Sequence, residues 1–323
     1  MDTWYCNRAP DIVTKDSKSM IHPFIVKGYK GLTVNPYQGC QHRCGYCYAT
    51  YEWSPQFYDK IYAKSNAPEV LENQLKSWKS KTIKPVMVSS ATDPYQPAEI
   101  RYGLTRKCVE VLQKYNVPYY IFTKSTIISR DLELHKRYKN NCFLVWSVTT
   151  CSEKIRRVIE PGTPPANSMF SAIRKFTRSG IRCGVNVDPI LPLITDSEED
   201  IESIVDSCNR SGVDYVFGAF LRLRVDIWER MQIILKLLGV DNGLDIYRKT
   251  IYKFTEPLKP CYNIAASVCY SSKVLQHLKG KVLEKGMLFD FPEFIEERHI
   301  KTSKNNHHNI NDTKRQVTLA RYM

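Results

Sequence analysis

Residues 35–49 read NPYQGCQHRCGYCYA and place Cys40, Cys44 and Cys47 in one short loop with the spacing C-x3-C-x2-C. Three thiolates this close together can bind one face of an iron–sulfur cluster, which is normally held by four cysteines. The loop offers no fourth cysteine, so a bound 4Fe–4S cluster would keep one iron open to a ligand from outside the protein. The alternative is a zinc site completed by His42 or a distant cysteine, but zinc motifs usually come as two C-x2-C pairs, and the sequence has no second pair.

Around this loop, short apolar runs alternate with amphipathic segments about six times between residues 32 and 238. The predicted strands are 32–35, 85–90, 118–123, 142–148, 182–187 and 214–221, and the predicted helices are 67–78, 105–115, 129–138, 168–179, 198–209 and 227–238. Short connections between such segments are typical of βα units on a parallel sheet. Six units are too few for a closed eight-stranded barrel and too many for a small doubly wound domain. We therefore expect an α/β fold built on a partial (β/α)6 TIM-type barrel.

The rest of the chain divides around this barrel. We expect an N-terminal lead-in over residues 1–30 and the barrel over residues 31–238. Residues 239–297 are predicted to form a C-terminal extension of helices and loops, interrupted by prolines. Residues 298–323 are basic and polar, which is typical of a flexible tail.

Composition and charge narrow the class of protein. Hydrophobic residues make up 43% of the 323 residues and charged residues 25%, which excludes a largely disordered chain. The N-terminus has no apolar export signal and no run approaches the roughly 18 apolar residues that span a bilayer, so we expect a cytoplasmic protein away from membranes. Its 11 cysteines are an odd number and, outside the loop, scattered, which argues against a disulfide framework. The net charge of +14 suits a polyanionic partner such as nucleic acid, and equally a solvated basic surface.

Polar residues follow the predicted strands, at the end of a barrel where chemistry takes place. They occur at 89–93, 123–125, 147–149 and 188–189. A lysine and hydroxyl groups at neighbouring strand ends can hold a zwitterionic amino acid group through charge-assisted hydrogen bonds. Taken singly, each residue favours a structural interpretation, with Thr92 and Asp93 in a turn before Pro94 and Lys124 as a solvated loop lysine. Taken together at successive strand ends, they favour ligand roles.

The cysteine loop resembles the radical SAM superfamily, and its longer sequence is similar to the branch related to spore photoproduct lyase. The likeness covers about residues 31–225 and continues in SSATDPYQPAE (89–99), YIFTKS (120–125), WSVTT (146–150), IEPGTPP (159–165) and VNVDPILP (185–192). The resemblance implies a six-stranded partial barrel with a 4Fe–4S cluster on the three cysteines and S-adenosylmethionine (SAM) on the open iron. An electron from the cluster then cleaves SAM to a 5′-deoxyadenosyl radical, which abstracts a hydrogen atom from the substrate.

The same resemblance implies contacts to SAM. Tyr46 would lie against the adenine, Thr92 and Asp93 match a polar pair, Lys124 matches a lysine that meets the SAM carboxylate, and Ser147 matches a further serine. It also implies a reducing partner of the flavodoxin or ferredoxin type.

The substrate class stays open at this point. Kinship and charge favour nucleic acid, and a peptide, protein or small metabolite is the alternative within the same chemistry. A protein stabilised by zinc or iron–sulfur and without catalysis is the alternative of another class. The sequence does not assign an oligomeric state, a role for Cys261 and Cys269, or whether SAM is consumed.

One departure from the lyase concerns the return of the hydrogen atom. The lyase carries a cysteine donor near the start of its second motif, and the matching residue here is Ser90. Because a serine O–H bond is too strong to donate a hydrogen atom readily, we do not expect cleavage of spore photoproduct itself. Cys151, just past a predicted strand, is the candidate for a substitute donor. Tyr37 and Tyr95 are candidates for a radical relay.

Two further residues of the matched motifs have no single reading. Glu160 in IEPGTPP is either structural or substrate-facing. Asp188, at the end of the fifth predicted strand, is placed to point into the barrel.

Overall fold

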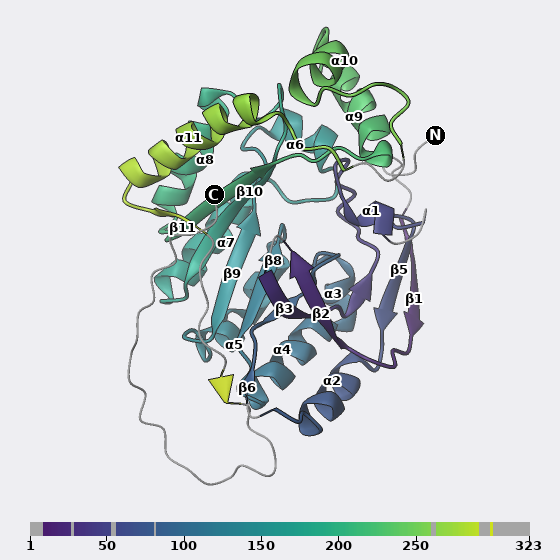
Figure 1. Cartoon of the computed structure of the whole chain (residues 1–323). Helices are drawn as coiled ribbons and strands as arrows, with labels where there is room; N and C mark the ends of the chain where they lie inside the picture. The colour runs from purple at the N-terminus through teal and green to yellow at the C-terminus, as the bar shows by residue number, and fades with distance from the viewer. Residues whose placement is uncertain are drawn as a thin grey trace.

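The computed structural model describes residues 9–26, 29–52, 56–80, 82–259, 263–290 and 298–299. Its centre is an eight-stranded sheet in the order β12-β11-β10-β9-β8-β7-β3-β2 (Figure 1). The strands are β2 (Ile21–Val26), β3 (Tyr29–Val34), β7 (Val86–Val88), β8 (Tyr119–Thr123), β9 (Cys142–Ser147), β10 (Cys183–Ile190), β11 (Tyr215–Phe220) and β12 (Leu288–Phe289). Every pair from β3 to β12 is parallel, and β2 adds to β3 as an antiparallel hairpin.

The predicted partial (β/α)6 barrel is confirmed. The six predicted strands correspond to β3 and β7 to β11, each within a few residues of its predicted bounds. The helices that alternate with them are α2 (Ala67–Lys76), α3 (Ala98–Tyr102), α4 (Leu104–Lys114), η2 (Ile127–Asp131), α5 (Leu132–Lys136), α6 (Glu153–Ile159), α7 (Ala166–Arg178), α8 (Glu198–Arg210) and α9 (Val225–Leu237).

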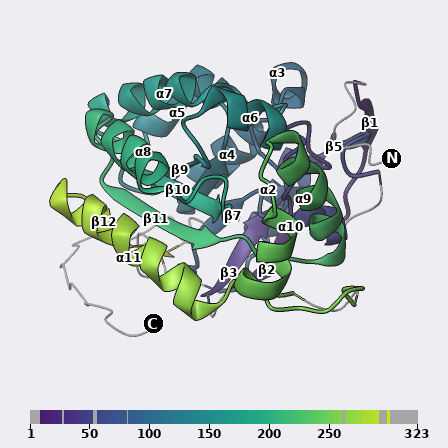
Figure 2. The same cartoon turned by 90° about the horizontal axis from the view of Figure 1, so that it is seen from above.

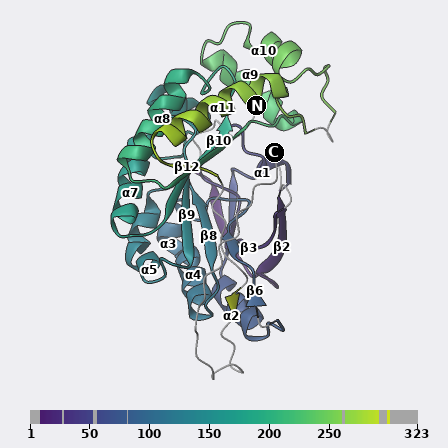
Figure 3. The ribbon, with the colours of Figure 1, turned by 60° about the vertical axis from the view of Figure 1, so that its left-hand side comes forward.

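Helices α3, α4, α5, α7 and α8 lie on one side of the sheet (Figure 3). The main core fills the space between them, because alternate residues of each strand point toward the helices. Trp146 of β9 and Phe176 of α7 show this packing, with ring centroids 5.4 Å apart and both side chains fully buried. The helices thus leave the other face of the sheet, here called the inner face, to a separate set of side chains.

The N-terminal residues take part in two sheets. Strand β1 (Asp11–Lys15) pairs in parallel with β5 (Lys60–Lys64), and β4 (Tyr37–Gln38) joins β5 on its other side. This three-stranded sheet carries the start of the cysteine loop, because β4 ends two residues before Cys40. The short strands β6 (Thr82–Ile83) and β13 (Arg298–His299) also pair, while residues 300–323 of the predicted tail lie outside the described residues.

The C-terminal extension returns to the cysteine loop. After α9 it forms α10 (Gly243–Ile246), a π-helical turn η3 (Tyr247–Ile251) and α11 (Val268–Glu284). Helices α9 and α10 lie near the carboxyl ends of the strands, and α11 runs beside α8 and β11 (Figures 1 and 2). A second core joins α9 and η3 to Cys40 and Cys44. None of the helices among the described residues is long and apolar enough to cross a membrane.

Candidate functional site

The cysteine loop is held in shape by its backbone. Gly39 has φ +83°, and a Cβ at this position would lie 2.4 Å from the carbonyl oxygen of Lys60, so only glycine fits. The Gly45 amide donates to the carbonyl of Ile159 at 2.8 Å, and the Tyr58 hydroxyl donates to the carbonyl of Cys44 at 2.6 Å. The loop is therefore attached both to the small sheet and to the end of α6.

The three thiols of the loop are the candidate ligands of an iron–sulfur cluster. Cys40 and Cys44 are buried and Cys47 is half-buried. Burial raises the pKa of Cys40 to about 12, and that of Cys44 well above its ordinary value, with Cys40 and Cys47 close enough to raise the pKa of Cys44 further. Iron binding would have to displace these protons, as it does for thiolate ligands in general.

A single metal ion and a 4Fe–4S cluster need different arrangements of their protein ligands. In the part of the chain that the structure describes, no three His, Cys, Asp or Glu side chains are arranged around one ion. In a 4Fe–4S cluster each thiolate binds its own iron, so the thiols surround the cluster instead of converging on a point.

A polar cluster lies beside the loop at the ends of β8 and β9. Lys124 Nζ lies 3.0 Å from Glu160 Oε1 and donates to the carbonyl of Ser147 at 3.2 Å and to Thr149 Oγ1 at 3.3 Å. The Tyr46 hydroxyl donates to the same Glu160 carboxylate, and its ring centroid lies 5.6 Å from Lys124 Nζ. The structure thus brings Lys124 to Tyr46 and to the backbone carbonyl of Ser147, with Glu160 between Tyr46 and Lys124. That these residues contact SAM stays a prediction.

The Lys124–Glu160 pair is charged. Burial alone would raise the pKa of Glu160, but Lys124 and the Tyr46 and Thr149 hydroxyls hold it below its ordinary value. Burial likewise acts to lower the pKa of Lys124, and the Glu160 carboxylate outweighs it, so the pKa of this lysine is raised. Both groups are ionised at neutral pH, which a buried pair requires for mutual stabilisation.

Two hydroxyl groups near the carboxyl end of β7 are unsatisfied. Ser89 Oγ and Thr92 Oγ1 are buried and have no hydrogen-bond partner among the described residues. Ser89 also has φ +65°, a left-handed conformation that is uncommon for serine. Strained backbone and orphan polar atoms cluster at ligand sites, and a bound ligand can satisfy them.

Unlike the hydroxyl of its neighbour Thr92, the Asp93 carboxylate has several hydrogen-bond partners within the protein. Its Oδ1 accepts from the Tyr95 amide and the Thr123 hydroxyl, both at 2.8 Å. Its Oδ2 accepts from the Lys124 amide at 2.6 Å and lies 3.1 Å from Nε2 of His42. The carboxylate therefore joins the ends of β7 and β8 to the cysteine loop.

The structure does not bring Cys151 to this cluster. Burial raises the pKa of the Cys151 thiol, and hydrogen bonds with the Ser203 and Ser207 hydroxyls of α8 partly offset that rise. The residue packs against the main core on the helical side of the sheet. A role as hydrogen donor would require its thiol to leave these hydroxyls. Cys261 lies outside the described residues, and Cys269 is exposed on α11.

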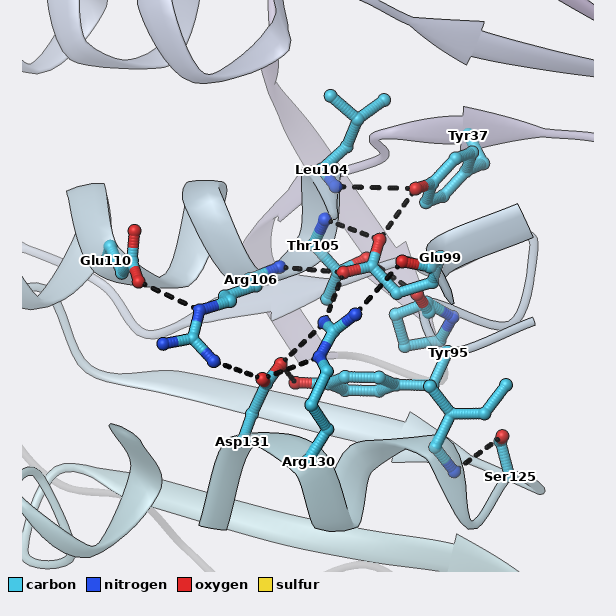
Figure 4. Close-up of polar contacts among 12 residues, drawn as sticks. Tyr37, Tyr95, Glu99, Leu104, Thr105, Arg106, Glu110, Ser125, Arg130 and Asp131 are labelled. Carbon is cyan, nitrogen blue, oxygen red and sulfur yellow. Dashed lines mark hydrogen bonds and ion pairs between the residues drawn. The ribbon is translucent and has the colours of Figure 1, made fainter. Parts of the chain in front are cut away.

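Tyr37 and Tyr95 belong to a second buried polar network (Figure 4). The Tyr37 hydroxyl donates to Glu99 at 2.6 Å, and the Tyr95 hydroxyl donates to Asp131 at 3.2 Å. Arg130 bridges the two carboxylates, with Nη2 2.9 Å from Glu99 and Nε 2.9 Å from Asp131. This network fastens the segments that precede Cys40 and follow Asp93 to the helices.

Aromatic side chains cover the inner face of the sheet below the polar cluster. Tyr120 and Phe143 are buried there, and Phe122, Tyr215 and Phe217 are half-buried in the same hydrophobic cluster. The rings of Phe122 and Phe217 meet edge to face, with centroids 6.3 Å apart.

The register of the strands shows how these aromatic residues lie relative to the polar cluster. Ser147 pairs with Asn186, and Asn186 pairs with Phe217, so the three residues form one row across β9, β10 and β11. Lys124 follows Thr123, the partner of Trp146, and therefore stands at the level of this row. A ligand long enough to extend from Lys124 across β9 and β10 would thus reach Asn186 and Phe217.

One residue of the site had no interpretation from sequence, and another was left with two. Arg230 on α9 donates from Nε to the carbonyl of Gly45 at 2.6 Å, although no motif marks the segment around it. The quoted motif IEPGTPP contains Glu160, but nothing in it indicated that its carboxylate would join Tyr46 to Lys124.

Comparison with known proteins agrees with this geometry. Residues 34–208, more than half of the chain, match the family model described as the radical SAM superfamily. An uncharacterized protein of Mycobacterium tuberculosis is 33% identical over 203 residues, which are 59% of each chain, so this chain spans only part of that relative. An uncharacterized protein of Acidianus two-tailed virus is 31% identical over 235 residues, covering 67% of this chain and 75% of the viral one.

The solved structures show which fold this is. A spore photoproduct lyase variant with bound AdoMet and dinucleoside spore photoproduct superposes with a TM-score of 0.65. The match covers 84% of this chain and 79% of the lyase at 15% identity. The spore photoproduct lyase complexed with dinucleoside spore photoproduct gives the same TM-score at 14% identity.

Proposed function

Because this chain belongs to the radical SAM superfamily, we propose that it binds a 4Fe–4S cluster through Cys40, Cys44 and Cys47 and is a radical SAM enzyme. When bound, the cluster supplies an electron that cleaves SAM reductively to a 5′-deoxyadenosyl radical, which abstracts a hydrogen atom from the substrate. One observation carries the proposal: the loop that holds the cysteines is hydrogen-bonded, through Tyr46 and Glu160, to Lys124 at a neighbouring strand end.

The residues around the loop have the chemistry to bind SAM. Lys124 would pair with the SAM carboxylate, in a charge-assisted bond worth about 1.5–3 kcal/mol. The unsatisfied hydroxyls of Ser89 and Thr92 would form hydrogen bonds with polar groups of SAM. Tyr46 would lie against the adenine, and Asp93 would act by holding the Lys124 backbone.

The inner face favours a substrate with planar rings, and we propose a nucleic acid. Half-buried Phe122, Tyr215 and Phe217 offer stacking surfaces, and base–aromatic stacking contributes about 1–3 kcal/mol per base. Asn186 stands beside them with an amide that can pair with a base edge. The net charge of +14 suits a polyanion, and the lyase that shares this fold binds a dinucleoside lesion.

Binding measurements separate this substrate class from its alternatives. Nucleic acid would bind with an affinity that falls steeply with salt, because phosphate contacts release counterions. A peptide, protein or small metabolite as the substrate predicts no such binding. Since Ser90 stands where the lyase has its cysteine donor, the proposed reaction is not the cleavage of spore photoproduct. A protein partner of the flavodoxin or ferredoxin type would deliver the electron.

The cofactor assignment can be tested by spectroscopy. Protein reconstituted anaerobically with iron and sulfide should give the electron paramagnetic resonance (EPR) signal of a reduced 4Fe–4S cluster. That signal should change when SAM is added, because SAM would bind the open iron. A colourless protein that holds zinc and no acid-labile sulfide would contradict the proposal and favour a structural zinc site.

A further inference from the structure

We propose that Arg230 is a positioning residue of the iron–sulfur site, which fixes the backbone between Cys44 and Cys47 and raises the reduction potential of the cluster. This inference rests on the proposed function, because it assumes that the cysteine loop binds a 4Fe–4S cluster.

The contacts of Arg230 are concentrated on the cysteine loop. Its Nε donates to the carbonyl of Gly45 at 2.6 Å, and its Nη2 donates to the carbonyl of Cys47 at 3.2 Å. Nη2 also reaches Thr50 Oγ1 and Asp226 Oδ2, each at 3.0 Å. A planar guanidinium can address several acceptors at once, which a lysine ammonium cannot do with the same geometry.

The arrangement joins two distant parts of the chain. Asp226 and Arg230 are one helical turn apart on α9, and they meet a loop more than 170 residues earlier in the sequence. Thr50 closes the contact, because its hydroxyl lies 2.6 Å from Asp226 Oδ2 and 2.8 Å from the carbonyl of Cys47. Helix α9 thereby holds the loop through contacts separate from those of β4.

Arg230 is the charged group of this pair that touches the backbone between Cys44 and Cys47. Its side chain is 7% exposed, so water screens its charge little. The guanidinium contacts the carbonyls of Gly45 and Cys47 directly, whereas the Asp226 carboxylate contacts this region through the Thr50 hydroxyl. The positive group of the pair is therefore the one in direct contact with the cysteine loop.

A buried cation in contact with the loop has a definite consequence for a cluster held by three thiolates. Reduction adds one negative charge to the cluster, and a nearby buried cation stabilises the reduced form more than the oxidised form. Charge and hydrogen bonding around a cluster are known determinants of its potential. Arg230 would in this way make the cluster easier to reduce. Its guanidinium hydrogen bonds to the Gly45 and Cys47 carbonyls would also keep the loop in the conformation that retains iron.

The test uses the full chain with its cluster reconstituted. The variants are Arg230→Met, which loses both the positive charge and the guanidinium hydrogen bonds, and Arg230→Lys, which keeps the charge but loses the guanidinium geometry. Lys236→Met is the matched control, because Lys236 is an exposed cation on the same helix. The two readouts are the midpoint potential, from potentiometric titration followed by EPR, and the rate of iron release to a chelator.

We expect Arg230→Met to have a more negative potential than the wild type and to release iron about tenfold faster, as for outer contacts of metal sites in general. Arg230→Lys should keep a potential near that of the wild type while releasing iron faster. Lys236→Met should match the wild type in both measurements. If Arg230→Met holds too little cluster to titrate, the lysine variant carries the test through its iron release.

Unchanged potential and iron release in Arg230→Met would overturn the inference, as would iron release at the wild-type rate in Arg230→Lys. These outcomes are distinguishable from failure of the proposed function. A wild-type protein that holds the cluster but never cleaves SAM would refute the function, yet the potentials would still measure the effect of Arg230. A wild-type protein that takes up no cluster would refute both.

Discussion

Replacing Glu160 with glutamine should leave Lys124 as a largely buried cation with only neutral acceptors. The two side chains are 2% and 12% exposed, and their charged atoms lie 3.0 Å apart. Removing one partner of a buried ion pair costs about 3–5 kcal/mol, because the other charge stays desolvated. Since Lys124 keeps its hydrogen bonds to Ser147 and Thr149, we expect the lower end, about 3 kcal/mol. At about 2 °C per kcal/mol, the melting temperature would fall by roughly 6 °C.

The measurement is urea denaturation of the metal-free protein at pH 7, so that cluster binding does not contribute. Glu110→Gln is the matched control, because this glutamate pairs with Arg106 and the two side chains are 45% and 40% exposed. Exposed pairs are worth about 0–1 kcal/mol, so the control should lose little. A Glu160→Gln variant no less stable than Glu110→Gln would contradict the expected cost of the unpaired lysine.

The same variant has a predictable pH dependence. The pKa of Glu160 lies below its ordinary value of 4.5 in the folded protein. Its contribution to stability is therefore fully present above about pH 4.5 and is lost as the pH falls through the folded-state pKa. The difference in stability between the wild type and Glu160→Gln should accordingly be largest at neutral pH and shrink in acid.

Three other predictions concern separate parts of the account. Lys124→Met should weaken SAM binding to the cluster-loaded protein by about ten- to a hundredfold, measured by anaerobic calorimetry, because a charge-assisted contact is lost; unchanged affinity would exclude this lysine as a SAM ligand. Phe217→Ala should weaken single-stranded nucleic acid binding by about 1–3 kcal/mol in a fluorescence anisotropy titration, and equal affinity would mean that bases do not stack there. Burial lowers the pKa of His135 to about 4, so the unfolded chain binds this proton more readily, and stability should fall as the pH drops from 6.5 to 4. His135→Gln should flatten that slope in urea melts, and an unchanged slope would contradict the assignment.

The strands of the barrel were predictable because their burial is simple. Strand β9 is buried on both faces and reads as a continuous apolar run, CFLVWS. Strand β1 gave no such signal, because most of its residues are exposed or half-buried and it is held by pairing with β5. Hydrophobic periodicity reports burial, so it misses strands whose stability comes from a partner distant in sequence.

The sequence could predict those parts of the site that come from the ends of neighbouring strands. Parallel strands end at the same edge of a sheet, so polar residues after β8 and β9 had to lie near one another, and Lys124 does reach Ser147. Arg230 lies more than 180 residues from the loop carbonyls that it binds, and no local pattern encodes such a contact. The contact of the Cys151 thiol with α8 could not be predicted either, because it depends on how the chain turns after β9.

Radical SAM chemistry in this protein is tested most simply by the formation of 5′-deoxyadenosine. Anaerobically reconstituted protein would be mixed with SAM and dithionite, and the product would be quantified by mass spectrometry beside a Cys44→Ala control. Radical SAM activity predicts 5′-deoxyadenosine from the wild type and none from the variant. A wild-type protein with its full complement of iron and sulfide and with SAM bound, but forming no 5′-deoxyadenosine under reduction, would contradict it.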